Sequence, residues 1–308
     1  MDGEAVPDER LRMILTACHP ALAPEARIAL TLRYAAGLTT AEIARLFHVA
    51  EPAMAARLTR AKQKIARAGI PYRVPGAAEL PQRLTAARAV VYLVFTEGHA
   101  PTRGAAVVRP QLCDEAVRLA RILHELTPED EQTTALLALL LLTHARTPAR
   151  TAADGAPILL ADQDRGAWDT RKLAEGATLL DTLGERGSPY AVQARIAAEH
   201  ARPAGPDWPR IADLFAELES LTPTPAVRLN RAVAVAEADG PRAGLALLDD
   251  VAQTLHATSG FHTARAELLA RAGDHAAAEA AYDDALARAQ NAATRTHLQR
   301  RRTELRSS

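Results

Sequence analysis

Cysteine and aromatic residues are scarce in this sequence, and their scarcity excludes several classes of protein. The 308 residues include two cysteines, Cys18 and Cys113, and aromatic residues make up 4% of the chain. Two isolated cysteines cannot build a disulfide framework or a zinc site, which favours a reducing compartment. Strands prefer aromatic and β-branched residues, whereas alanine, leucine and arginine dominate here. The composition therefore predicts an all-α fold.

Long hydrophobic runs are also lacking, and we expect no secretory leader. The apolar run from Leu136 to Leu142 is too short to cross a bilayer. Near the N-terminus, Asp2 and Glu4 stand where a signal peptide carries basic residues followed by an apolar core. We therefore expect a cytoplasmic protein that has no membrane partner.

No pattern typical of an active site or a metal centre occurs in the sequence. None of the ten histidines belongs to an HExxH motif, and neither a Gly-x-Ser-x-Gly elbow nor a glycine-rich phosphate loop is found. We interpret the acidic residues Asp162, Asp164 and Asp169, which surround Arg165 and Trp168, as helix caps and ion-pair partners. We therefore expect no enzyme activity, no cofactor and no metal.

Charge is balanced over the chain but not along it. Lysine and arginine number 37, as do aspartate and glutamate. Between Glu25 and Arg73, nine basic residues face three acidic ones, a local excess of +6, so the remainder carries −6. An asymmetry of this kind favours a local nucleic-acid surface.

Prolines divide the sequence into three blocks, which we predict to be three domains. Residues 1–73 form the first block, and Pro71 and Pro75 stop any helix at its end. Residues 74–169 form a helical middle domain with helical patterns at 83–96, 114–125 and 132–143. A turn-rich piece before Ile158 is the one place where a short strand or β-like hairpin is expected. Residues 170–308 are predicted to be a series of helices.

The third block contains an internal period. Gly240 and Gly273 each follow a helical pattern and lie 33 residues apart. A helix-Gly-helix unit of roughly 34 residues is typical of tetratricopeptide repeats, in which each helix pair stacks on the next. We predict tetratricopeptide-like helical hairpins here, with a regulatory protein as a candidate partner.

Residues 25–67 have the pattern of a helix-turn-helix. Pro24 begins a first helix, and Gly37 stands after it where a left-handed residue is needed. Thr39 with Glu42 predicts a capped start of the second helix. Glu51 and Pro52 open the third, because proline is tolerated in a first turn.

The third helix has one apolar side and one basic side. Met54, Leu58, Ala61 and Ile65 fall on one arc, and Arg57, Arg60, Lys64 and Arg67 fall on another. A recognition helix needs both, since one side holds the domain while the other meets phosphates and base edges. Arginine can donate two hydrogen bonds to guanine, while lysine and the threonine hydroxyl are better suited to contact phosphate. The predicted DNA-binding residues are Arg33, Thr39, Thr40, Glu51, Ala53, Arg57, Arg60, Lys64 and Arg67.

Several motifs in order give the chain a family resemblance. The runs Ala41 to Ala44 and Ala55 to Lys62 resemble region 4 of sigma-70 factors. Five further segments resemble extracytoplasmic-function sigma factors that carry a tetratricopeptide-like C-terminal extension; they are Cys18 to Leu22, Ala68 to Pro75, Tyr92 to Gly98, Asp162 to Asp169 and Leu229 to Ala234. The resemblance covers nearly the whole chain.

The resemblance implies promoter DNA and RNA polymerase core as partners. Region 4 of such factors reads the −35 promoter element and touches the polymerase β flap, and the extension tunes activity. The resemblance implies that relatives begin with region 2, and we expect none here, because Met1 lies only a short linker before region 4. We therefore expect that this chain alone does not initiate transcription, because its gene is truncated, its start is misplaced or region 2 lies on another polypeptide. Ala50, Ala53 and Ala56 stand where proline, threonine and glutamine are expected in relatives, and because alanine offers bases no hydrogen bond, weaker base readout is predicted.

Two other functions remain open from the sequence. The chain could be a tetratricopeptide-like protein-interaction scaffold with a vestigial helix-turn-helix. This alternative would be favoured if the second block covered the basic side of the third helix. It could also be a ligand-responsive one-component regulator, although the run Arg57 to Lys62 resembles sigma factors more closely.

Overall fold

The protein is all-α, as the composition predicts. The computed structural model describes residues 9–34, 37–47, 49–70, 76, 78–101, 104–184 and 187–307. Within these ranges the only β pairings are isolated bridges, Gly104 with Asn291 and Thr151 with Pro157. The second bridge lies at the predicted β-like hairpin, where Gly155 has a φ of +84°.

Sixteen α-helices and three short 3₁₀ helices account for the fold in the described ranges. The first seven α-helices are α1 (Glu9–Ala17), α2 (Pro24–Tyr34), α3 (Thr40–Leu46), α4 (Glu51–Arg67), α5 (Leu80–His99), α6 (Pro110–Leu126) and α7 (Glu131–His144). The 3₁₀ helices are η1 (Thr147–Ala149), η2 (Leu160–Asp162) and η3 (Arg165–Ala167). The remaining α-helices are α8 (Thr170–Asp181), α9 (Pro189–His200), α10 (Trp208–Leu221), α11 (Pro225–Asp239), α12 (Pro241–Asp249), α13 (Ala252–Leu255), α14 (Ser259–Arg271), α15 (His275–Arg288) and α16 (Ala292–Ser307).

The chain packs into two compact units. The first holds Met1–Gly98 and Pro110–Thr133, and the second holds His99–Arg109 and Thr134–Ser308. Helices α5 and α6 therefore belong with α1 to α4, whereas the prolines group them with the residues that follow. The division into three domains at 73 and 169 stays a prediction.

In the first unit, a buried apolar core joins the short N-terminal helices. Ile14, Leu15, Leu30, Ile43 and Met54 have side chains that are almost completely buried. Helix α5 is tied to this core, because the buried Arg83 guanidinium donates a 3.1 Å hydrogen bond to the carbonyl of Leu15.

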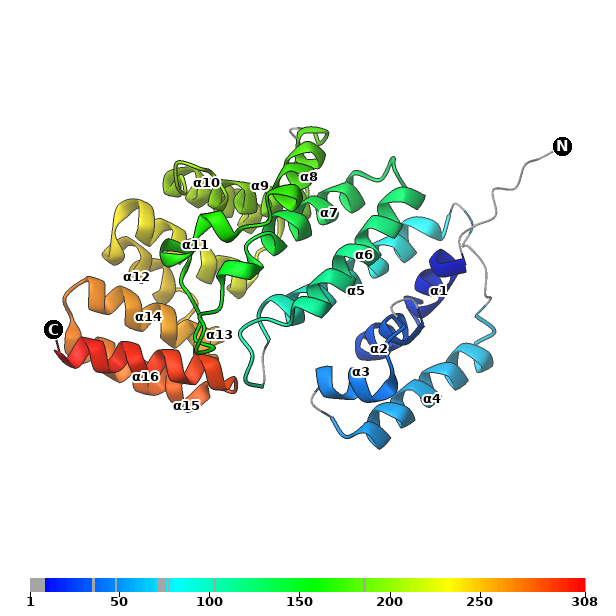
Figure 1. The fold of residues 1–308 in the computed structure, drawn as a ribbon, viewed down its shortest axis with the longest axis horizontal. Helices are drawn as coiled ribbons and strands as arrows, with labels where there is room; N and C mark the ends of the chain where they lie inside the picture. The colour runs from blue at the N-terminus through cyan, green and yellow to red at the C-terminus, as the bar shows by residue number, and fades with distance from the viewer. Residues whose placement is uncertain are drawn as a thin grey trace. The chain divides into compact units, whose positions relative to one another are not determined.

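In the second unit, successive helices pack as antiparallel neighbours. Helix α9 packs on α10, α10 on α11, α11 on α12, α14 on α15 and α15 on α16, in the part of Figure 1 that runs from yellow-green to red. Small residues allow close approach. A Cβ added at Gly244 of α12 would lie 2.5 Å from the Ala236 Cβ and 2.6 Å from the Ala232 carbonyl of α11.

The glycines of the internal period lie where helices change direction. Gly240, between α11 and α12, has a φ of +98°, and Gly273, between α14 and α15, has a φ of +83°. A positive φ favours glycine because glycine has no Cβ. The helical hairpins thus recur as predicted, while their assignment to the tetratricopeptide class stays a prediction.

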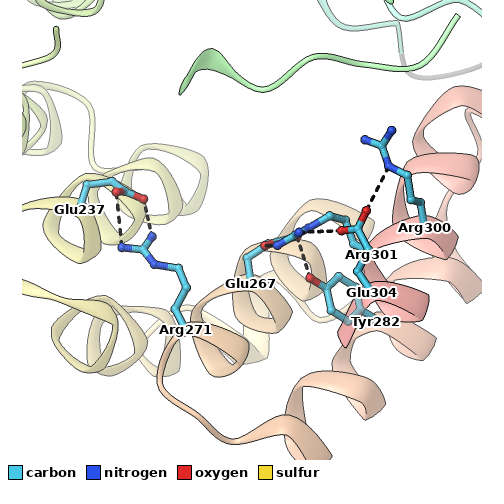
Figure 2. Close-up of polar contacts among 7 residues, drawn as sticks. All are labelled: Glu237, Glu267, Arg271, Tyr282, Arg300, Arg301 and Glu304. Carbon is cyan, nitrogen blue, oxygen red and sulfur yellow. Dashed lines mark hydrogen bonds and ion pairs between the residues drawn. The ribbon is translucent and has the colours of Figure 1, made fainter. Parts of the chain in front are cut away.

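Ion pairs link the last helices (Figure 2). Glu267 of α14 accepts two hydrogen bonds from Arg301 of α16, at 3.0 and 2.8 Å, and one from the hydroxyl of Tyr282 in α15, at 2.7 Å. Arg271 of α14 pairs with Glu237 of α11. The Arg301 guanidinium holds the pKa of Glu267 below its ordinary value despite the burial of that carboxyl.

Candidate nucleic-acid interface

Helix α3 is held by a capping box. The Thr39 hydroxyl accepts a 3.2 Å hydrogen bond from the Glu42 amide, and the Glu42 carboxylate accepts from the Thr39 amide and hydroxyl, both at 2.7 Å. This reciprocal arrangement satisfies donors that a helix start leaves unpaired. The predicted cap is confirmed, and it fixes where α3 begins.

Helix α4 is anchored through its predicted apolar side. Met54, Leu58 and Ala61 are buried, and Ile65 is half-buried. The helix packs against α3 and α2. It starts with Pro52 in its first turn, and Ala50 before it makes no side-chain cap. Tertiary packing therefore holds α4 in place, with no help from a polar cap.

The opposite side of α4 carries exposed basic side chains. Arg60, Lys64 and Arg67 are exposed, while Arg57 is half-buried with its guanidinium carbon 5.6 Å from the centre of the Phe47 ring. Each lies three or four residues from the next, which places them along one face of the helix. The basic face of α4, defined as Arg57, Arg60, Lys64 and Arg67, is exposed at Arg60, Lys64 and Arg67, whereas Arg57, which the sequence also predicts to be open, is half-buried.

Two shallow depressions follow this face. One, of about 370 Å³, lies between α4 and the start of α2 and is lined by Leu22, Ala23, Glu25, Ala26, Arg57, Arg60, Ala61 and Lys64. The other, of about 570 Å³, is lined by Arg60, Gln63, Lys64, Arg67 and Ala68. Positive charge prevails in both, since Glu25 is the only acidic residue among those lining them.

Three predicted site residues are not part of the basic face. Two of them make hydrogen bonds within the protein, and the third lies on α3. Arg33 donates a 2.8 Å hydrogen bond to the Leu38 carbonyl, so it closes the turn after α2. Thr39 is engaged in the capping box. Thr40 is the first residue of α3 and is half-exposed.

Glu51 and Ala53 are exposed at the start of α4, the end that a recognition helix directs at bases. The packing also reveals residues that the sequence prediction missed. Gln63 lines the second depression, and Lys62 lies 5.0 Å from the centre of the Tyr34 ring of α2. The place of Gln63 beside Arg60 and Arg67 follows from helical spacing, so the sequence could have suggested it. The position of Lys62 over the Tyr34 ring depends on how α2 packs.

Cys18 lies in the core beneath the helix-turn-helix. It is fully buried, and its sulfur lies 3.7 Å from the Thr31 hydroxyl. Burial raises the pKa of the Cys18 thiol to about 12, which disfavours the reactive thiolate.

The described part of the chain holds no metal-binding cluster and no helix that could span a membrane. Among the described residues, no group of three or more His, Cys, Asp or Glu side chains is arranged to hold a metal ion. None of the helices in the described ranges is long and apolar enough to span a membrane.

Comparison with known proteins gives two family matches and one close relative. Residues 12–65 match the family model "Sigma-70, region 4", and residues 83–183 match a family of unknown function, DUF6596. The chain is 42% identical to an uncharacterized protein of Rhizobium meliloti (strain 1021) over 303 residues, which cover 97% of this chain and 72% of the relative. The region 4 match includes α2, α3 and most of α4, and therefore the whole basic face except Arg67.

Proposed function

We propose, since this chain belongs to the sigma-70 family, that its helix-turn-helix binds the −35 promoter element and RNA polymerase core. One observation carries the proposal. Arg60, Lys64 and Arg67 are exposed on the side of α4 opposite the buried Met54 and Leu58. This is the arrangement in which a helix can enter the major groove while its other side stays in the core.

We further propose that the chain is of the extracytoplasmic-function type and acts in the cytoplasm as a binding protein, not as an enzyme. Its later helices would form a tetratricopeptide-like extension that regulates activity through a protein partner. Support for this extension comes from the hairpins that turn at Gly240 and Gly273. The scaffold alternative would need a covered basic face, and the exposure of Arg60, Lys64 and Arg67 argues against it.

Chromatin immunoprecipitation of the full chain tests this function. We expect enriched fragments upstream of transcription starts that share one −35-like motif and are also occupied by RNA polymerase. Arg60→Ala should abolish most of the enrichment because it removes an exposed charge from the basic face. The matched control is Arg242→Ala, which removes an exposed arginine of α12 and should leave enrichment unchanged.

The other outcomes separate the alternatives. Enrichment without polymerase would favour a one-component regulator. No enrichment, or equal enrichment with Arg60→Ala, would contradict promoter docking by α4 and favour the scaffold.

A further inference from the structure

Three stretches of the second unit converge around Arg146, which lies between α7 and η1. The Asp169 amide donates a 2.9 Å hydrogen bond to the Ala145 carbonyl, so the chain returns to this point before α8. The Arg165 guanidinium carbon lies 4.6 Å from the centre of the Trp168 ring. Arg165 also donates a 2.8 Å hydrogen bond to the Arg202 carbonyl just after α9.

Polar atoms on this segment are buried without partners. The donors Arg146 Nε and Trp168 Nε1 are enclosed and make no hydrogen bond. The acceptor Gln163 Oε1 is also enclosed and unpaired. Trp168 is only 5% exposed. Within the described residues, the Arg146 side chain has no hydrogen bond or ion pair at all. Buried donors are nearly always paired in folded proteins, so unpaired ones suggest a missing acceptor.

The carboxylates of this region are committed to other groups. Asp169 pairs with Lys172 at 2.6 Å, and Glu199 and Asp207 pair with Arg202 at 3.1 and 3.0 Å. None of these three carboxylates therefore balances the charge of Arg146.

Positive charge consequently accumulates around Arg146. Burial, with the nearby charges of Arg150 and Arg165, lowers the pKa of Arg146 to about 10. Burial and the charge of Arg146 lower the pKa of His200 to about 4. A mostly buried cation without a counter-charge is costly, and an anion placed beside it would offset that cost.

We propose that Arg146 and the Trp168 indole N–H form a binding site for the oxyanion of a small metabolite, either a phosphoryl or a carboxylate group. Guanidinium donors match the paired oxygens of such groups, and the indole offers one further donor. Arg165, held by the Trp168 ring and the Arg202 carbonyl, adds positive potential. The site makes the second unit a small-molecule binding module, a role separate from the binding of DNA.

The two tryptophans of the chain give a direct readout of binding. They are Trp168 itself and Trp208, whose ring centre lies 5.6 Å from that of His200. The full chain is titrated with sodium phosphate, sodium citrate and sodium chloride at constant ionic strength, without DNA. We expect a saturable change of tryptophan fluorescence with phosphate or citrate and none with chloride; the more effective anion identifies the group. Arg146→Met should weaken binding about tenfold or more.

A matched variant and a melting experiment separate binding from a structural role. Arg265→Met, which removes an arginine paired with Asp249 in the same unit, should keep the fluorescence response. Without added anion, Arg146→Met should melt no lower than the wild type, because it removes an unpaired buried charge. The proposal is overturned if no anion gives a saturable response, if Arg146→Met responds like the wild type, or if it melts lower and phosphate and citrate fail to stabilise the wild type.

Discussion

At the residue scale, Gly244 sets how closely α11 and α12 approach. We predict that Gly244→Ala lowers the free energy of unfolding of the second unit by about 1–3 kcal/mol, because its Cβ would overlap the Ala236 Cβ and the Ala232 carbonyl. Chemical denaturation followed by circular dichroism measures this change. Gly260→Ala is the control, since a Cβ there meets nothing within 4 Å. Equal stabilities for the two variants would refute the close approach.

Single residues are also the hardest feature to predict from sequence. The shared face of Arg57, Arg60, Lys64 and Arg67 follows from helical spacing alone; the exposure of Arg60, Lys64 and Arg67 is confirmed, while Arg57 is half-buried. Arg33 has the same chemistry, yet it closes a turn through the Leu38 carbonyl. Helical spacing shows which side chains share a face, but it does not show which of them find a partner within the protein. That DNA is contacted by the open side chains stays a prediction.

At the element scale, the start of α3 depends on its capping box. Thr39→Ala should lower the local stability of α3 by about 1 kcal/mol, because the Glu42 amide loses its acceptor. Hydrogen exchange of peptides covering residues 40–46 should speed up accordingly. Thr39→Asn should restore much of the protection, because asparagine also caps helices well. Unchanged exchange in Thr39→Ala would mean that packing alone fixes α3.

Most helices could be predicted from sequence because their signals are local. The patterns at 83–96, 114–125 and 132–143 correspond to α5, α6 and α7, each of which extends further than its pattern. Pro24 and Pro52 mark the starts of α2 and α4 because proline suits a first turn. The unpaired state of Arg146 could not be predicted, since it depends on three segments that meet only after folding.

At the scale of the whole molecule, buried histidines should make stability depend on pH. Burial lowers the pKa of His200 from 6.5 to about 4 and lowers that of His99 well below 6.5. Such groups bind protons mainly when unfolded. Their contribution to the free energy of unfolding is therefore complete above about pH 6.5 and is lost as the pH falls toward the pKa of the folded state. For His200 the loss is roughly 3 kcal/mol.

Thermal melts between pH 7 and pH 4 measure this effect. His200→Phe, which keeps a ring beside Trp208, should melt with a visibly smaller decline over that range. His275→Asn, at an exposed position of α15, should decline like the wild type. An identical decline in His200→Phe would assign the acid sensitivity to other groups.

Domain boundaries are a property of the whole molecule that local patterns reveal poorly. Pro71 and Pro75 predict from sequence that no helix continues through them, but such a signal does not tell which core the next helix joins. Arg83 of α5 reaches the Leu15 carbonyl of α1, a hydrogen bond across 68 residues of sequence. Such long-range interactions group α5 with α1, and the periodicity of neither helix predicts them.

The salt dependence of duplex binding tests the central claim, that the basic face of α4 meets DNA. The affinity of the full chain for a promoter-length duplex is measured by fluorescence anisotropy over a series of salt concentrations. Replacing Arg60, Lys64 and Arg67 together with alanine should reduce the slope of log affinity against log salt by about 3, one unit for each phosphate that the variant no longer neutralises. A slope that is unchanged in the triple variant would contradict the account.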